Sequence, residues 1–204
     1  MASYHGPKLR LSRGLEVPIA ETPKHVTTKR QKRPGCHGYR RARLSLYGIQ
    51  LKEKKKVASY YNIRNSQLRR YVKQAQSVDN PPPRALQEIL ESRLDNVIRR
   101  LRWARTIWQA RQMVCHGHFL VNGRKVDQPS FCVKPGDIIT VKTPSHSFVR
   151  KCAESTEGMG FRVPDWLLVD QSRLEATILH PPQFQEVLIP FEVDYNKLIE
   201  FYTR

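Results

Sequence analysis

The sequence predicts an α+β protein. Apolar residues recur at i, i+3, i+4 and i+7 through much of residues 65–114, which is typical of amphipathic helices. Two short strand-like runs follow at 119–121 and 138–141. Asn122-Gly123, directly after the first run, is the preferred two-residue loop of a type I′ hairpin. Helices followed by a small antiparallel sheet indicate the α+β class.

Residues 1–45 are basic and rich in Pro and Gly, with almost no helical periodicity. Such a segment buries too little apolar surface to fold alone. We expect an extended basic arm that becomes ordered on a phosphate surface, and a flexible solubilising tail is the alternative. Residues 34–38 form a turn with two glycines, where the backbone can approach a ligand closely.

Residues 46–91 predict a helical domain. Its first helix is strongly basic over 52–56, and its second follows Asn65, an expected N-cap. Apolar residues at helical spacing give that second helix a buried side: Leu68, Tyr71, Val72 and Ala75. After a proline break a third helix begins near Pro83. We expect it to bury Leu86, Ile89 and Leu90.

Residues 92–142 predict a compact module of two short helices and a small sheet. Ser92 with Asp95, and Thr106 with Gln109, have capping-box spacing at the two helix starts. Gly117 is placed to end the second helix. The first helix has an apolar stripe at Leu94, Val97, Ile98 and Leu101. Arg93, Asn96 and Arg100 occupy its opposite face, which we expect to point outward. The last strand of the small sheet is 138–141.

The remaining chain divides into a polar stretch, 143–162, expected to be a linker or loop, and the segment 163–204. That segment holds strand-like runs at 166–169, 176–179 and 187–190. Its apolar end, 198–202, is expected to pack back on the helical domain.

Charge favours a nucleic-acid partner. The chain carries a net charge of +18, and residues 1–80 hold 19 Lys and Arg against 4 Asp and Glu, whereas 143–204 hold 6 against 9. A polyphosphate partner accounts for this asymmetry because each neutralised phosphate releases counterions. A membrane surface would attract the same charge, but no bulky apolar helix face accompanies the basic runs. No membrane-spanning run or signal-peptide core is present, and four scattered cysteines fit an intracellular, metal-free chain.

Arginine is suited to phosphate because its planar fork donates two parallel hydrogen bonds. A surface salt bridge is the alternative role of any single arginine. The aromatic residues Tyr47, Tyr60, Tyr61, Trp103 and Trp108 could stack on bases, but a core position is the commoner use of such residues. The predicted RNA-binding residues are Arg33, His37, Arg41, Arg43, Lys52, Lys55, Arg69, Arg70, Lys73, Arg93, Asn96, Arg100, Arg105, Arg111, Gln112, His116, Asn122, Gly123, Arg124 and Lys125.

No catalytic motif is convincing. Arg93-Leu94-Asp95 resembles the R-L-D of RNA pseudouridine synthases, but a plain amphipathic helix follows it here, and Asp95 suits a helix N-terminus as a capping carboxylate. His116 and His118 have no third metal ligand nearby in sequence. No phosphate-binding loop or nucleophile elbow occurs. We therefore expect no enzymatic activity, cofactor, metal or small-molecule substrate.

Several ordered stretches resemble the bacterial-type S-four family of small-subunit ribosomal proteins. They are residues 6–13, 34–38, 47–54, 91–101, 109–127, 129–137 and 199–204, including E-S-R-L-D-N-V-I-R-R-L and H-F-L-V-N-G-R-K-V-D. The middle stretch alone would indicate only an RNA-binding module that is shared with some synthetases and RNA-modifying enzymes.

The resemblance implies a primary 16S rRNA-binding protein that binds the 5′ domain and nucleates assembly of the small-subunit body. It implies contacts with small-subunit protein five and other small-subunit proteins, and a joint influence with protein twelve on translational accuracy. It also implies a discontinuous helical domain, 46–91 completed by 163–204, that is interrupted by an alpha-L-type module at 92–142. The expected location is the cytoplasmic ribosome, with an organellar ribosome as the alternative.

Two features of this chain depart from the family pattern. Ile107 stands where an Arg often follows the helix cap, so that RNA contact is lost or moves to Arg105. The N-terminal cysteine zinc site of some relatives is lacking. A free RNA-modifying or RNA-chaperone protein built on the same module is the alternative function, and the missing catalytic domain argues against the former.

Overall fold

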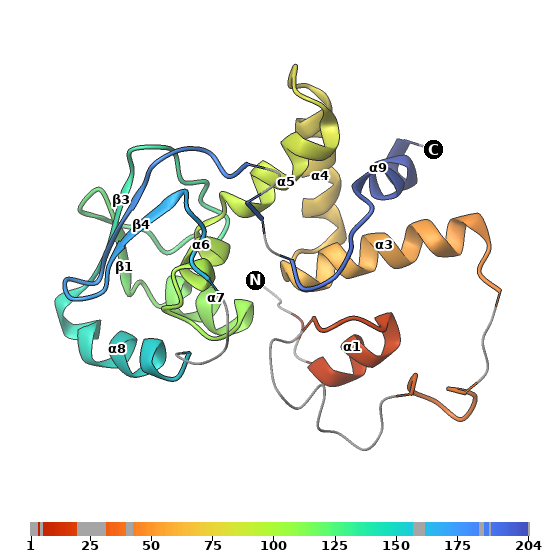
Figure 1. The fold of residues 1–204 in the computed structure, drawn as a ribbon, viewed down its shortest axis with the longest axis horizontal. Helices are drawn as coiled ribbons and strands as arrows, with labels where there is room; N and C mark the ends of the chain where they lie inside the picture. The colour runs from red at the N-terminus through yellow and green to blue at the C-terminus, as the bar shows by residue number, and fades with distance from the viewer. Residues whose placement is uncertain are drawn as a thin grey trace. The chain divides into compact units, whose positions relative to one another are not determined.

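The computed structural model describes residues 4, 6–19, 32–39, 43–156, 162–183, 186–187 and 189–203. It confirms the α+β class, with helices and one antiparallel sheet (Figure 1). The chain divides into two units, Met1–Pro83 with Ile189–Arg204, and Arg84–Leu188. No helix in the described ranges is both long enough and apolar enough to cross a bilayer.

The first unit contains four helices in its described part. They are α1 (Lys8–Leu15), α3 (Leu46–Tyr60), α4 (Asn65–Gln76) and α9 (Tyr195–Thr203). The last helix, α9, packs along α3 and also contacts α4, which confirms the expectation for the apolar end of the chain. Side chains join these helices, since Gln50 donates to Glu200 at 2.9 Å and the Tyr202 hydroxyl donates to Asn65 at 2.7 Å.

Two details of this unit differ from the prediction. Asn65 is the first residue of α4 and does not cap it, because its side-chain oxygen accepts the Tyr202 hydroxyl of a helix distant in sequence. Part of the segment predicted as an extended arm forms α1, which packs against α3. The end of α1 and the chain that follows it bury Leu15, Val17 and Ile19, and this burial stabilises a helix whose own sequence has little helical periodicity.

The second unit combines helices with a five-stranded sheet. Its helices are α5 (Pro82–Glu91, with two residues in the first unit), α6 (Leu94–Arg100), α7 (Ile107–Cys115), the 3-10 turn η1 (Thr143–Ser145) and α8 (His146–Glu154). The strands are β1 (Phe119–Val121), β2 (Arg124–Lys125), β3 (Ile138–Val141), β4 (Leu167–Asp170) and β5 (Glu175–Ile178). They pair antiparallel in the order β2-β1-β3-β5-β4.

One core lies between this sheet and the helices α6 and α7, which cover one of its faces (Figure 1). Trp103 stacks on Phe119 with ring centroids 5.9 Å apart, and both side chains are fully buried. Tyr60 and Tyr61 are buried in the first unit. These aromatic residues are therefore core residues, whereas Tyr47 is exposed and lies 5.5 Å from Phe201.

The sheet is larger than the sequence pattern predicts. The runs 166–169 and 176–179 do form strands, β4 and β5, and β5 pairs with β3, which was expected to be the last strand of the sheet. The stretch expected to be a linker contains α8, which buries Val149, Cys152 and Ala153. Of the run 187–190, Leu188 lies outside the described residues and its described members are not in a strand.

Candidate nucleic-acid interface

The β1–β2 hairpin presents two cations on a turn of fixed shape. Asn122 and Gly123 both have positive φ, 50° and 75°, and Val121 pairs with Arg124, which confirms the predicted type I′ turn. The Asn122 side chain donates to Asp137 at 2.8 Å and accepts from the Ile138 amide at 2.9 Å. The turn is thus fastened to the start of β3, and Arg124 and Lys125 are exposed beside it.

Helix α7 adds polar groups on its exposed side. Thr106 caps the helix by accepting from the Gln109 amide at 3.3 Å, so this half of the capping box is confirmed. The Gln109 side chain accepts instead from the Arg105 amide, one residue before the cap. Gln112 and His116 are exposed. Gly117, with φ 71°, ends the helix as predicted.

The predicted outward stripe on α6 is wrong. Arg93 and Asn96 are fully buried, and 9% of the Arg100 side chain is exposed. The reason is the segment 129–133, which covers the start of α6: the Leu94 amide donates to the Phe131 carbonyl at 2.8 Å, and the Asp95 amide donates to Pro129 at 3.2 Å. The stripe therefore lies inside the second unit and does not face solvent.

The first capping box is wrong for the same reason. Ser92 Oγ donates back to the Glu88 carbonyl at 2.7 Å, and no side chain caps α6. Asp95 instead accepts two hydrogen bonds from Arg93, at 3.0 and 2.6 Å, and lies 3.5 Å from Arg111. Burial raises the pKa of Asp95, while Arg93 and Arg111 act in the opposite direction. Its carboxylate is occupied by two guanidinium groups.

Glu91 organises a second buried network, in which Asn96 and Arg100 have structural partners. Arg100 donates two bonds to its carboxylate, at 2.9 and 2.8 Å, and Asn96 donates to it at 2.6 Å. Arg99 then donates to Asn96 Oδ1 at 2.6 Å. Arg111 is also mostly covered, with 13% of its side chain exposed. These polar groups hold α5, α6 and α7 together.

In the first unit α4 carries the clearest basic face. The predicted apolar side of this helix is buried as expected, and Arg69, Arg70 and Lys73 are exposed on the other side. Lys55 of α3 is exposed as well. None of these four cations forms an ion pair with an acidic residue in the described part of the chain, so their charges face solvent.

The basic residues nearer the N-terminus divide into two groups. Arg33 and Lys52 both bind Glu16, at 2.8 and 2.6 Å, and their hydrogen bonds lower the pKa of Glu16 to about 2. They fasten the segment after α1 to α3. His37 and Arg43 are exposed, and Arg41 lies outside the described residues.

The described part of the chain contains no group of three His, Cys, Asp or Glu side chains that could hold a metal ion. His116 and His118 have ring centroids 6.0 Å apart. Three further residues lie beside these rings, Lys142, Phe148 and Ser145, and none of them was predicted as a site residue. Antiparallel pairing of Phe119 with Val141 places Lys142 beside His118, but that pairing is visible only in the fold.

Comparison with known proteins gives two family models and many full-length relatives. The S4 domain model matches residues 92–139, and the ribosomal protein S4/S9 N-terminal domain model matches residues 3–95. The chain is 40% identical over 205 residues to the small ribosomal subunit protein uS4 of a Geobacillus species, covering 100% of both chains. It is 39% identical to the proteins of the same name from Thermotoga petrophila, over 212 residues, and Gloeobacter violaceus, over 210, again covering 100% of each chain.

Proposed function

This chain belongs to the uS4 family of small ribosomal subunit proteins, and on that premise we propose that it binds small-subunit rRNA directly through the exposed cations of its two units. It is a structural component of the small subunit. The observation that carries the proposal is charge segregation on a folded surface. From Asn96 to Val126 the chain has no acidic residue and seven Arg and Lys, of which Arg124 and Lys125 are exposed on the hairpin.

The proposed interface of the second unit is the exposed end of α7 together with the hairpin. Gln112 lies on α7 and His116 directly follows it, Arg124 and Lys125 follow the turn, and partly buried Arg105 precedes the α7 cap. Arginine forks and lysine ammonium groups on a rigid turn suit phosphate oxygens. Arg93, Asn96 and Arg100 contribute indirectly, because their buried hydrogen bonds fix the start of α6 and hold it to the end of α5.

The proposed interface of the first unit is the outer face of α4, with Lys55 of α3. Three cations within five residues, Arg69, Arg70 and Lys73, lie on a helix whose opposite side is locked into the core. A fixed row of charges suits the regular phosphate spacing of an RNA helix, which proteins recognise mainly by shape and backbone.

Family membership supports finer proposals. We expect the rRNA target to be the 5′ domain of 16S rRNA, bound early so that it nucleates assembly of the small-subunit body. We expect contact with small-subunit protein five and an influence, together with protein twelve, on translational accuracy. We propose no catalytic role, since Asp95, the carboxylate of the R-L-D motif, is ion-paired with Arg93 inside the core.

Filter binding with the full chain tests the proposal. The measured quantity is the affinity for a transcribed 5′-domain fragment, compared with an rRNA fragment of equal length from the large subunit, over a series of salt concentrations. We expect selective binding to the 5′ domain and an affinity that falls steeply with salt. Equal affinity for both fragments would contradict the proposal and leave a non-selective RNA chaperone as the function.

A further inference from the structure

Three aromatic rings form a row on the surface of the second unit. His116 follows the end of α7, His118 precedes β1, and Phe148 lies in α8. The His116 and His118 centroids are 6.0 Å apart, and those of His118 and Phe148 are 5.5 Å apart. Phe148 is 44% exposed, and it is the one exposed Phe, Tyr or Trp in the described part of 84–188. We call these three residues the ring row.

The ring row is held in position by the fold. His118 Nδ1 lies 2.8 Å from Ser145 Oγ, and the Lys142 amide donates to the His118 carbonyl at 2.9 Å. Val149, next to Phe148, is fully buried and anchors α8 to the core. The rings therefore have fixed places before any ligand arrives, which lowers the entropy that binding would cost.

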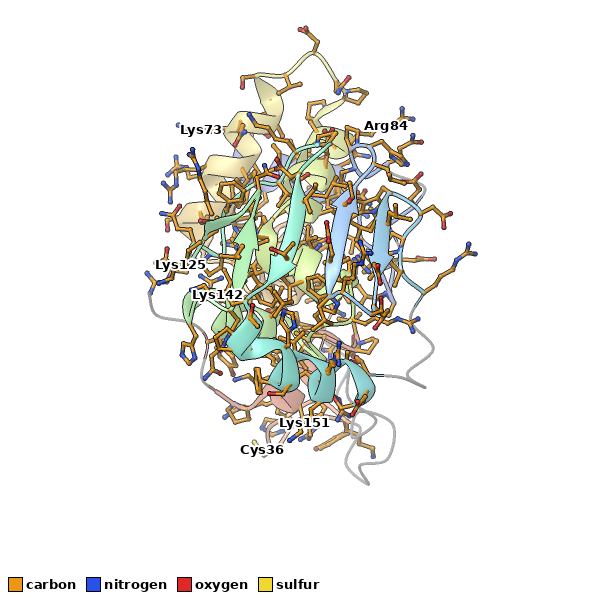
Figure 2. All side chains as sticks on the ribbon, turned by 90° about the vertical axis from the view of Figure 1, so that its left-hand side faces the viewer. Cys36, Lys73, Arg84, Lys125, Lys142 and Lys151 are labelled. Atoms are coloured by element: carbon orange, nitrogen blue, oxygen red, sulfur yellow. The ribbon has the colours of Figure 1, made fainter. Side chains whose placement is uncertain are left out.

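Two lysines flank the ring row. The Lys125 side chain crosses Gly117, the residue between the two histidines, closely enough that a Cβ at Gly117 would collide with it. Lys142 is the cross-strand neighbour of His118. Lys125 lies in the edge strand β2 and Lys142 follows the central strand β3, and Figure 2 labels both on the left of the sheet. The segments that supply them, 96–126 and 138–153, contain no acidic residue.

The charge and the rings together select the ligand. Burial lowers the pKa of His118, with His116 and Lys142 acting in the same direction, and this shift favours the neutral ring that stacks on a base. An acidic peptide would engage the lysines and leave the rings unused. An unpaired nucleotide uses both, because its base stacks on an aromatic ring while its phosphates bind lysine.

We propose that the ring row stacks unpaired nucleobases of the bound RNA, with Lys125 and Lys142 on the flanking phosphates. This inference rests on the proposed function and specifies the ligand at the edge of that interface. Stacking of this kind tolerates any base, because every base has a π face. Its contribution is therefore to affinity for a single-stranded element such as a loop or bulge.

Phe148 is the residue to change, since its exposed ring can be removed without opening the core. Phe148→Ala should weaken binding of the full chain to the 5′-domain fragment and to oligouridine of 12 nucleotides by roughly tenfold. Phe148→Trp should retain the affinity because it keeps a stacking surface. Leu168→Ala is the matched control, as it removes an exposed apolar side chain from β4, and it should leave the affinity unchanged. Thermal melting verifies that each variant is folded.

Cross-linking with 4-thiouridine-substituted RNA gives a second measurement. We expect nucleotide adducts on two tryptic peptides, 112–124, which holds both histidines, and 143–150, which holds Phe148. Unchanged affinity of Phe148→Ala, or adducts confined to other peptides, would overturn the proposal, as would a cross-link of peptide 143–150 to another protein only. A third outcome separates the two proposals. If the wild-type chain shows no preference for the 5′ domain but binds oligouridine in a way that depends on Phe148, the proposed function is contradicted and the stacking role of the ring row is supported.

Discussion

Asp95 is a single carboxylate that keeps two arginines inside the second unit. Its removal leaves Arg93 as a fully buried cation without its bidentate partner. We expect Asp95→Ala to lower the free energy of unfolding by about 3–5 kcal/mol, as the breaking of a buried ion pair does. Urea denaturation of the full chain measures this loss.

The exposed pair between Asp170 and Arg173, 3.8 Å apart, provides the control for Asp95. Arg173→Ala, which leaves the turn hydrogen bonds of Asp170 in place, should change the unfolding midpoint little, because solvent screens a pair of this kind. A double variant, Arg93→Met with Asp95→Leu, should recover much of the lost stability, since apolar side chains of similar size can replace a buried pair. Equal losses for Asp95→Ala and Arg173→Ala would contradict the role assigned to the buried pair.

Glu16 should titrate far below an ordinary glutamate. Its folded pKa of about 2 lies under the usual 4.5 because Arg33 and Lys52 donate to its carboxylate. The stabilisation is therefore complete above pH 4.5 and disappears as the pH falls from 4.5 toward 2. Carbon-13 NMR of the Glu16 carboxyl measures the midpoint. In a double variant, Arg33→Gln with Lys52→Gln, the midpoint should return to the ordinary range of a glutamate. A midpoint near 4.5 in the wild type would contradict the ion pairs of Glu16 with Arg33 and Lys52.

At the residue scale, the sequence predicts which apolar residues are buried better than it predicts which polar residues are exposed. The inward apolar positions of α6 follow from helical spacing, and they are buried as expected. The outward placement of Arg93 and Asn96 fails because the segment 129–133, more than thirty residues later, covers that face. Local periodicity carries no information on a partner that distant in the chain.

At the scale of single elements, the β1–β2 hairpin gives the sharpest prediction. Gly123 has a φ of 75°, a backbone region in which a β-branched residue is strained. Gly123→Val should cost about 1–2 kcal/mol of stability, the usual penalty for a left-handed L-residue. Thermal melting measures it. Gly14→Ala is the control, because that helical glycine has open space around it and should tolerate or gain from alanine. Equal melting of the Gly123 variant and wild type would contradict the turn assignment.

The elements differ in how well the sequence predicts them. The hairpin, the cap of α7 and the apolar side of α4 depend on signals within a few residues, and all three are confirmed. β4 and β5 are recognisable as strands, but their membership of the sheet depends on pairing with β3 across a gap of more than thirty residues. Helix α8 was missed because the polar stretch 143–162 hides a short apolar side, Val149, Cys152 and Ala153.

For the whole molecule, charge predicts how RNA affinity depends on salt. Replacing the three exposed α4 cations Arg69, Arg70 and Lys73 by Gln should lower the log–log salt slope by roughly 2 to 3, at about 0.7 to 0.9 for each lost phosphate contact. Replacing Arg124 and Lys125 should lower it by roughly 1 to 2 on the same basis. Filter binding to the 5′-domain fragment measures both slopes.

The two effects should add, because the two sets of cations belong to separate units. Lys134→Gln with Lys151→Gln is a control of equal charge for the hairpin pair, drawn from exposed lysines outside the proposed interface. An equal slope change in this control would mean that net charge, and not the proposed surface, governs binding.

The overall charge asymmetry is plain in the sequence, but which cations are exposed depends on ion pairs such as Glu16 with Arg33 and Lys52.

The fastened hairpin turn has a consequence for the chemical ageing of the protein. An Asn-Gly pair deamidates when the glycine nitrogen attacks the asparagine side-chain carbonyl carbon, which closes a five-membered succinimide ring and releases ammonia. Water then opens the ring to aspartate or isoaspartate. In the folded chain the Asn122 amide is held by Asp137 on one side and by the Ile138 amide on the other, so it cannot swing toward Gly123 without breaking both bonds. We therefore expect Asn122 to resist deamidation while the hairpin is intact and to deamidate readily in urea. Mass spectrometry of the peptide 112–124 would detect the gain of about one mass unit, and equal rates in both conditions would show that the turn gives no protection.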